Sequence, residues 1–368
     1  MSKNKAMVLA AGLGTRLRPL TDLISKPMAP IVNKPVMEHI VELLIKHNFK
    51  DIICNLHWYP EAIKEYFGAG SKWGLNISYS LEETLLGTAG GVKKVEDFFE
   101  GETFIVISGD SLTDMNLTDV LEFHKKKGGI ATLALSEVED SWQYGVVLLD
   151  GNKKIIGFQE KPLSGEEKSN LANTGIYVFE HEIFDYIPFG AFYDFGKNVF
   201  PALLDKNVDY YGFKHNQYWN DVGGLEEYQR GNFDALEGKV KVSIPGIQIK
   251  DGVWVGKNCR IQEEVVIIPP VCIGDNCTIK KGAKLFGPII LGDNIIVDER
   301  AVLYRGIKWG GGYIGKDASL IGAIIGFNAK IKDKASVLEK AVIGSKSIIG
   351  DGIIIHPSVK IMSNEIIK

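Results

Sequence analysis

Glycines and basic residues are concentrated in one short stretch near the start of the chain. An apolar run, Met7 to Ala11, leads into a loop with two glycines, a threonine and two arginines: Gly12, Gly14, Thr15, Arg16 and Arg18. Lys26 follows, directly before a proline. Glycines let a backbone approach a ligand with its N–H groups turned inward, and basic side chains donate to phosphate oxygens. The stretch therefore predicts a polyphosphate site at the end of a strand, and the alternative is a plain turn with surface arginines.

The stretch matches neither of the two common phosphate-binding motifs. The P-loop string GxxxxGK[ST] is absent. The dinucleotide motif GxGxxG needs a third glycine where this chain has Leu17, and Pro19 disfavours the tightly packed helix that this motif opens.

Bulk properties exclude several classes of protein. With 368 residues, 45% of them hydrophobic and 24% charged, the chain is expected to form two or three soluble domains. A net charge of −4 gives no basic face for nucleic acid. The apolar run Ala6 to Ala11 is too short for a signal peptide or a membrane span, so neither is expected.

The cysteines and histidines show no metal-binding pattern. The four cysteines, Cys54, Cys259, Cys272 and Cys277, form no CxxC pair, which favours reduced thiols in the cytoplasm and no zinc site. Cys259 and Cys277 are 18 residues apart and are expected to stack without reacting.

Strands and helices alternate up to about Phe233. The apolar runs that predict buried strands are Met7–Ala11, Ile52–Leu56 and Phe104–Ile107. Amphipathic stretches between them, 36–47 and 61–67, predict helices. This order predicts an α/β domain with a mixed, mostly parallel sheet, in which ligands bind at the carboxyl ends of strands. Gly12 to Arg16 and Asp110 both fall there.

The second half of the chain has a different period. Every sixth residue from Val255 to Leu303, and again from Ile325 to Ile361, is aliphatic. This period predicts a parallel β-helix with 18 residues in each coil. Glycines and asparagines that recur at the same interval predict stacked corners: Gly256, Gly274, Gly292, Asn258, Asn276 and Asn294. The break across Arg305–Tyr313 is interpreted as a glycine-rich insertion.

One carboxylate is placed to hold a metal ion. Asp110 ends the strand that precedes it, opposite the phosphate loop, and Mg²⁺ in such sites takes few carboxylates. The alternative is a capping aspartate. Asp114 is expected to be a surface or capping residue.

The string GLGTRLRPLT followed by SKP resembles the signature of the sugar-1-phosphate nucleotidylyltransferases, and later motifs recur in that family's order up to about Gly223. The resemblance implies a Rossmann-like nucleotidyltransferase domain and a left-handed β-helix. It implies nucleotide contacts from the loop and from the base-recognition segment LGTAG: Ala10, Ala11, Gly12, Gly14, Thr15, Arg16, Lys26, Gly87, Thr88 and Gly109.

Further motifs resemble the sugar side of that family's site. The segments YGV, FQEKP and NTG imply sugar-phosphate contacts from Tyr144, Gly145, Glu160, Lys161, Asn173 and Gly175. Without the resemblance, the Glu160–Lys161 pair reads as an exposed surface pair. The resemblance also pairs Asp110 with Asp221, in WNDVG, as the two Mg²⁺ ligands, although 111 positions separate them.

The implied reaction joins two anions. A hexose 1-phosphate attacks the α-phosphorus of an NTP and pyrophosphate leaves, so catalysis rests on alignment and charge neutralisation. The catalytic residues implied are Arg16 for the β- and γ-phosphates, Lys26 for the α-phosphate, Lys161 for the nucleophile and Asp110 with Asp221 for Mg²⁺.

The choice of substrates is less determined. The segment 81–91 lacks the glutamine common in uridylyl- and thymidylyltransferases, and the motifs look most similar to mannose-1-phosphate guanylyltransferases, which predicts GTP and mannose 1-phosphate as substrates. Ala10-Ala11-Gly12 and Ser141-Trp142-Gln143 depart from the guanylyl pattern, which leaves glucose 1-phosphate with UTP, dTTP or ATP as alternatives.

Two other functions remain open. A nucleotide-sugar-sensing regulatory subunit would normally lack a loop arginine or a metal aspartate, and all of these are present. An acyltransferase would need a histidine on the β-helix, where only His356 occurs.

The expected domains are residues 1–236 for catalysis, 237–246 as a linker and 247–368 for the β-helix, which is expected to mediate homo-oligomerisation because its faces and open end need covering.

Overall fold

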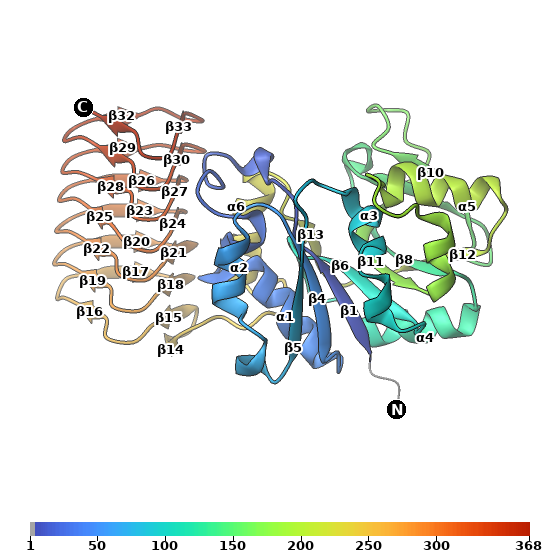
Figure 1. Cartoon of the computed structure of the whole chain (residues 1–368). Helices are drawn as coiled ribbons and strands as arrows, with labels where there is room; N and C mark the ends of the chain where they lie inside the picture. The colour runs from blue at the N-terminus through green and yellow to red at the C-terminus, as the bar shows by residue number, and fades with distance from the viewer. Residues whose placement is uncertain (1–3) are drawn as a thin grey trace. The chain divides into compact units, whose positions relative to one another are not determined.

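The computed structural model describes residues 4–368, which form two compact units (Figure 1). The sheet unit comprises the chain up to Leu13 together with Ile40–Asp221, and the β-helix unit comprises Gly14–His39 together with Val222–Lys368. The domain boundaries expected at residues 236 and 247 stay a prediction.

The sheet unit is built on a mixed nine-stranded sheet with the order β10-β9-β11-β6-β1-β4-β5, in which β8 pairs with β11 and β12. Its strands are β1 (Lys5–Leu9), β4 (Asp51–Leu56), β5 (Asn76–Leu81), β6 (Phe104–Ser108), β8 (Ala131–Glu137), β9 (Gly145–Leu149), β10 (Ile155–Glu160), β11 (Leu171–Phe179) and β12 (Tyr210–Lys214). Strands β6, β1, β4 and β5 are parallel, and β11 runs antiparallel to β6. The predicted α/β fold is confirmed.

Helices connect these strands, as the alternating pattern predicts. They are α1 (Val36–Lys46), α2 (Pro60–Phe67), α3 (Gly87–Lys93), α4 (Leu117–Lys127) and α5 (Phe200–Asp205). Stacked phenylalanine rings fill part of the core, and the centroids of Phe99 and Phe104 are 3.9 Å apart. Both rings are fully buried, so they anchor β6, whose end carries Asp110, against its covering layer.

The β-helix unit contains three sheets of eight, seven and six strands, which are parallel except that β14 (Ile247–Lys250) pairs antiparallel with the next strand. Its coil strands run from β15 (Val253–Val255) to β34 (Ile366–Ile367), and each pairs with the strand one coil later, as Val253 does with Val271. The aliphatics at period six form its interior, where Ile273, Ile279 and Leu285 are fully buried. The hexapeptide β-helix is confirmed, while its left hand stays a prediction from the resemblance.

The corners follow the predicted chemistry. Asn258, Asn276 and Asn294 all lie in the left-handed region, with φ between 56° and 58°. Cys259 and Cys277 sit on adjacent coils as free thiols, as predicted.

The expected insertion at Arg305–Tyr313 is wrong, because the coils there are shorter. Val302 pairs with Ser319 and Ser319 with Ser336, each 17 positions on, whereas Lys284 pairs with Val302 at 18. One residue is missing from each of two corners, after Tyr304 and after Ile321. Sequence counting could not separate a deletion from an insertion, since both shift the register.

The β-helix unit also contains the segment after the glycine loop. This segment forms two 3₁₀ turns, η1 (Thr15–Leu17) and η2 (Lys26–Met28), and a small hairpin, β2 (Pro30–Ile31) with β3 (Lys34–Pro35). Helix α6 (Leu225–Leu236) belongs to the same unit. Within residues 4–368 no helix combines the length and apolarity needed to cross a lipid bilayer.

Candidate active site

The ends of β1 and β6 meet at one edge of the sheet. The Gly109 N–H donates to the Leu9 carbonyl at 2.9 Å. A Cβ at Gly109 would lie 2.8 Å from Val8 Cγ1, so only glycine allows this approach. The predicted residues Ala10 and Asp110 therefore lie on the same edge.

Two predicted metal ligands are brought together by a short ribbon. Strand β7 (Ser111–Thr113) pairs antiparallel with β13 (Trp219–Asp221), and Asp221 is opposite Ser111. Asp221 is thus opposite the residue that follows Asp110, and both aspartates are half-buried. No group of three or more histidine, cysteine, aspartate or glutamate side chains suited to a metal occurs in the described part of the chain. Two carboxylates match Mg²⁺, which leaves its other positions to phosphate and water.

Asp114, which was expected to be a surface or capping residue, is half-buried and bonds to the residue that precedes a distant strand. Its carboxylate accepts from the Tyr218 N–H at 3.0 Å and so fixes the start of β13. Thr113 adds a hydrogen bond to the Tyr218 carbonyl.

A cavity of about 270 Å³ opens at this edge of the sheet unit. Five of the predicted residues line it: Ala11, Gly12, Gly87, Thr88 and Asp110. Gly87 starts α3 with φ of 74°, and a Cβ there would lie 2.4 Å from the Tyr193 carbonyl oxygen. The segment LGTAG, which is predicted to recognise the base, therefore depends on a glycine that no other residue replaces without strain.

Sequence reasoning missed Asn55, which also lines this cavity. Its side-chain oxygen accepts from the Ala10 N–H at 2.8 Å, and its amide donates to Glu82 at 2.8 Å. The second Glu82 oxygen accepts from the Leu86 N–H. Asn55 thus joins the glycine loop to the base loop. An asparagine inside the apolar run IICNL was the available signal, since a buried amide needs partners.

Asp194 was also missed, and its carboxylate links Thr88 to the turn that follows Asp194. Thr88 donates to its carboxylate at 2.9 Å, and the Gly196 N–H donates to it at 3.0 Å. Asp194 caps the turn Phe195–Val199, which has π-helical hydrogen bonding. Such turns are frequent at functional sites.

The predicted sugar residues converge in the sheet unit. Gly145 is opposite Glu160 in the β9–β10 pair, and a Cβ on Gly145 would lie 3.1 Å from Glu160 Oε2 and 3.5 Å from Asn173 Cβ. Asn173 donates to the Tyr177 hydroxyl at 2.9 Å. A Cβ on Gly175 would lie 2.5 Å from Ser108 Oγ, which places Gly175 beside the strand that leads to Asp110.

The electrostatics of Glu160 are unusual for a surface pair. Burial raises the pKa of Glu160, Asp194 adds to this effect, and Lys161 and Lys197 oppose it. Lys161 is exposed, with its backbone in the left-handed region (φ 46°), and its N–H donates to the Tyr144 carbonyl. The structure thus gathers Tyr144, Lys161 and Glu160 in one place.

The remaining predicted residues lie in the β-helix unit. Gly14, with φ of 64°, precedes η1, and its carbonyl accepts from the Thr21 hydroxyl at 2.7 Å. A Cβ on Gly14 would lie 2.8 Å from Lys26 Cβ, so these two predicted residues are close together. Lys26 is buried, whereas Thr15 and Arg16 are exposed.

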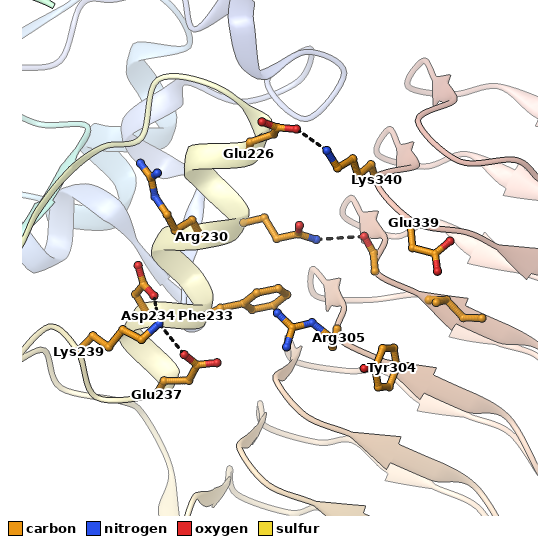
Figure 2. A pocket seen from close by; sticks show the side chains of 13 residues that line it. Glu226, Arg230, Phe233, Asp234, Glu237, Lys239, Tyr304, Arg305, Glu339 and Lys340 are labelled. Carbon is orange, nitrogen blue, oxygen red and sulfur yellow. Dashed lines mark hydrogen bonds and ion pairs between the residues drawn. The ribbon is translucent and has the colours of Figure 1, made fainter. Parts of the chain in front are cut away.

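A second cavity, of about 570 Å³, lies in the β-helix unit between α6 and the coils (Figure 2). It has equal numbers of acidic and basic side chains: Glu226, Asp234, Glu237, Glu339, Arg230, Lys239, Arg305 and Lys340. None of the predicted site residues lines it.

Comparisons with known proteins agree with this geometry. Residues 5–238 match the nucleotidyl transferase family, and residues 246–287 match the bacterial transferase hexapeptide family. A UTP–glucose-1-phosphate uridylyltransferase from Synechocystis is 44% identical over 69% of each chain. A mannose-1-phosphate guanylyltransferase from Mycobacterium tuberculosis is 36% identical over 63% of this chain and 65% of its own.

A solved structure is also similar. It is assigned as a glucose-1-phosphate thymidylyltransferase from Bacillus anthracis in complex with sucrose, with a TM-score of 0.59 and 26% identity over 66% of this chain and 98% of that one. Fold, site and matches define a nucleotidyltransferase. Within that class, the chain belongs to the sugar-1-phosphate nucleotidylyltransferase family.

Proposed function

We propose that this protein transfers a nucleotidyl group from an NTP to a hexose 1-phosphate with the help of Mg²⁺, and releases pyrophosphate. The observation that supports the proposal is the β7–β13 pairing, in which Asp221 is opposite Ser111, the residue after Asp110. A cavity lined by Gly12, Gly87 and Thr88 shares Asp110 with this pair.

In the proposed reaction, a phosphate oxygen of the sugar phosphate forms a bond to the α-phosphorus. The bond from that phosphorus to the bridging oxygen breaks, and pyrophosphate leaves with the electron pair. The attacking oxygen is already anionic, so no enzyme nucleophile is needed and positioning with neutralised charge suffices. Bound Mg²⁺ would supply charge neutralisation on Asp110 and Asp221.

The basic side chains complete the proposal. Arg16 binds the leaving β- and γ-phosphates, Lys26 approaches the α-phosphate and Lys161 holds the sugar phosphate in line. Both Glu160 and Asn173 lie beside Gly145. Glu160 therefore accepts hydrogen bonds from sugar hydroxyls, and Asn173 exchanges hydrogen bonds with them. Asn55 and Asp194 orient the two loops through the hydrogen bonds described above.

Two substrate pairs have specific support. GTP with mannose 1-phosphate, giving GDP-mannose, is favoured by the base loop without glutamine and by the guanylyltransferase relative at 36% identity. UTP with glucose 1-phosphate is favoured by the uridylyltransferase relative at 44% identity.

The test is pyrophosphate release measured for every pairing of GTP, UTP, dTTP and ATP with mannose 1-phosphate and glucose 1-phosphate, with and without Mg²⁺. One pairing should dominate and require the metal. Tight binding of a nucleotide sugar without turnover of any pair would favour the sensor function instead. Turnover of an acyl-CoA would indicate an acyltransferase.

We also propose that the protein acts as a cytoplasmic homo-oligomer assembled through its β-helix. Exposed aliphatics at the start of the β-helix, including Ile249 just before the first coil and Ile268 within it, support self-association.

A further inference from the structure

The segment that carries Arg16 and Lys26 is fastened to the β-helix through buried hydrogen bonds. We propose that Trp309 and Tyr228 are positioning residues for this segment, so that the β-helix sets the position of Lys26. The effect on turnover rests on the proposed function, whereas the fastening itself can be tested without it.

A single hydroxyl links three elements. The Trp309 indole N–H, from the β-helix, donates to the Tyr228 hydroxyl of α6 at 2.6 Å, and that hydroxyl donates to the Pro30 carbonyl of β2 at 2.6 Å. Both side chains are buried, with 1% and 0% exposure, and their rings meet edge to face. Burial raises the pKa of Tyr228 above its usual range, so the phenol remains a neutral donor.

The turn of the β2–β3 hairpin is strained, and hydrogen bonds to two elements hold it in place. Val32 and Asn33 have φ of 42° and 68°, and a β-branched residue at positive φ is an outlier. The Val32 N–H donates to Asn232 of α6 at 2.9 Å, and the Asn33 amide donates to the Leu291 carbonyl of the β-helix at 2.7 Å. Such strain persists only where the surroundings impose it.

Lys26 is coupled directly to this anchored hairpin. The Ala29 N–H donates to the Lys26 carbonyl at 3.0 Å, and Ala29 precedes Pro30. Earlier in the segment, Ser363 of the β-helix donates its hydroxyl to the Pro19 carbonyl at 3.2 Å. The segment is therefore attached to the β-helix on both sides of Lys26.

Helix α6 is itself fixed on the coils, as Figure 2 shows. The Gln229 amide donates to the Gly322 carbonyl at 3.1 Å, at one of the two shortened corners. The Arg305 guanidinium lies over the Phe233 ring at 5.4 Å. The Lys340–Glu226 pair is exposed and contributes little by comparison.

The experiment removes the linking hydroxyl in the full-length protein. Tyr228→Phe and Trp309→Phe should lower kcat about tenfold, because small displacements of aligned groups are costly, while KM for the sugar phosphate stays unchanged. Amide hydrogen exchange in residues 14–31 should accelerate about tenfold, as expected for local opening. Tyr210→Phe is the matched control, because that tyrosine is equally buried and donates to the Phe200 carbonyl in the sheet unit.

A milder variant guards against misfolding. Asn33→Gly keeps a residue suited to positive φ but removes the bond to Leu291, and it should show the same exchange pattern with a smaller loss of kcat. Unchanged exchange in residues 14–31 and unchanged kcat in Tyr228→Phe and Asn33→Gly would overturn the proposal. A wild-type protein without turnover, but with faster exchange in the variants, would leave the fastening intact and refute the proposed function alone.

Discussion

At the scale of single residues, the two aspartates carry the most specific prediction. Asp110→Asn and Asp221→Asn should each lower turnover by about two orders of magnitude or more, since each would remove a negative charge from the proposed Mg²⁺ site. Asp114→Asn is the control, because an amide oxygen can still accept from the Tyr218 N–H. The measurement is pyrophosphate release over a Mg²⁺ titration. Equal activity of all three variants would remove the pair from the mechanism.

Glu160 gives a prediction about pH. Burial raises its pKa, so it becomes protonated at a higher pH than an ordinary glutamate. If the ionised carboxylate binds sugar hydroxyls, KM for the sugar phosphate should rise as the pH falls through this raised pKa. Glu160→Gln should make KM for the sugar phosphate less dependent on pH in this range. Because the substrate's own titration affects both proteins equally, it cancels when the two KM profiles are compared.

The raised pKa of Glu160 affects stability in the opposite direction to substrate binding: lower pH weakens binding but stabilises the fold. A carboxyl whose pKa is raised by folding contributes its full stability below the unfolded pKa and loses it as the pH rises through the folded pKa. The melting temperature of Glu160→Gln relative to wild type should therefore increase between acidic and neutral pH. A pH-independent difference in melting temperature would contradict the role of burial.

The residues that sequence reasoning found and missed differ in a physical way. Arg16 and Asp110 belong to contiguous strings whose residue types suggest phosphate and metal binding, whereas Glu160 was singled out only through the resemblance of its string FQEKP to the family. Asn55 and Asp194 act through partners far along the chain, such as Ala10 and Thr88, and no local pattern encodes those contacts. The resemblance supplied the pairing of Asp110 with Asp221, which only the β7–β13 ribbon explains.

At the scale of elements, a substitution at the first residue of α3 tests the predicted nucleotide-binding role of the segment LGTAG. Gly87→Ala would force a Cβ against the Tyr193 carbonyl and place alanine at positive φ, at a cost of about 1–3 kcal/mol. We expect a weaker NTP affinity and a lower melting temperature. Gly151→Ala is the control, because an added Cβ there has nothing within 4 Å. Equal behaviour of both variants in calorimetric nucleotide binding would refute the assigned role.

The sequence predicts elements better than their junctions. Period six defines the β-helix interior because most inward positions are aliphatic, although Lys308 is buried in register with Leu291 and Ile325. Alternation of strands and helices defines the sheet unit. The shortened corners after Tyr304 and Ile321 could not be predicted, because a corner faces outward and tolerates a lost residue. That the corner after Ile321 accepts the Gln229 amide of α6 is visible only in the three-dimensional structure.

At the scale of the whole molecule, the strand that immediately precedes the coils predicts how copies associate. Strand β14 (Ile247–Lys250) pairs with β15 and ends the eight-stranded sheet, so one of its edges offers unpaired backbone groups. Its residues are all exposed, including Ile247 at 74% and Ile249 at 60%. An apolar open edge of this kind is an association site unless something covers it, and a second copy would cover it.

Ile249→Lys should therefore lower the molar mass measured by light scattering after gel filtration, because a buried charge at the edge opposes pairing. Ile296→Lys is the control, since Ile296 is also exposed, at 42%, but lies in β22 (Ile296–Val297) with a strand on either side. If Ile249→Lys keeps the wild-type mass while Ile296→Lys loses it, association uses the flat face of the coils instead of the open edge. If the wild-type protein elutes as a monomer at micromolar concentration, both modes of association, through the β14 edge and through the flat face, are excluded.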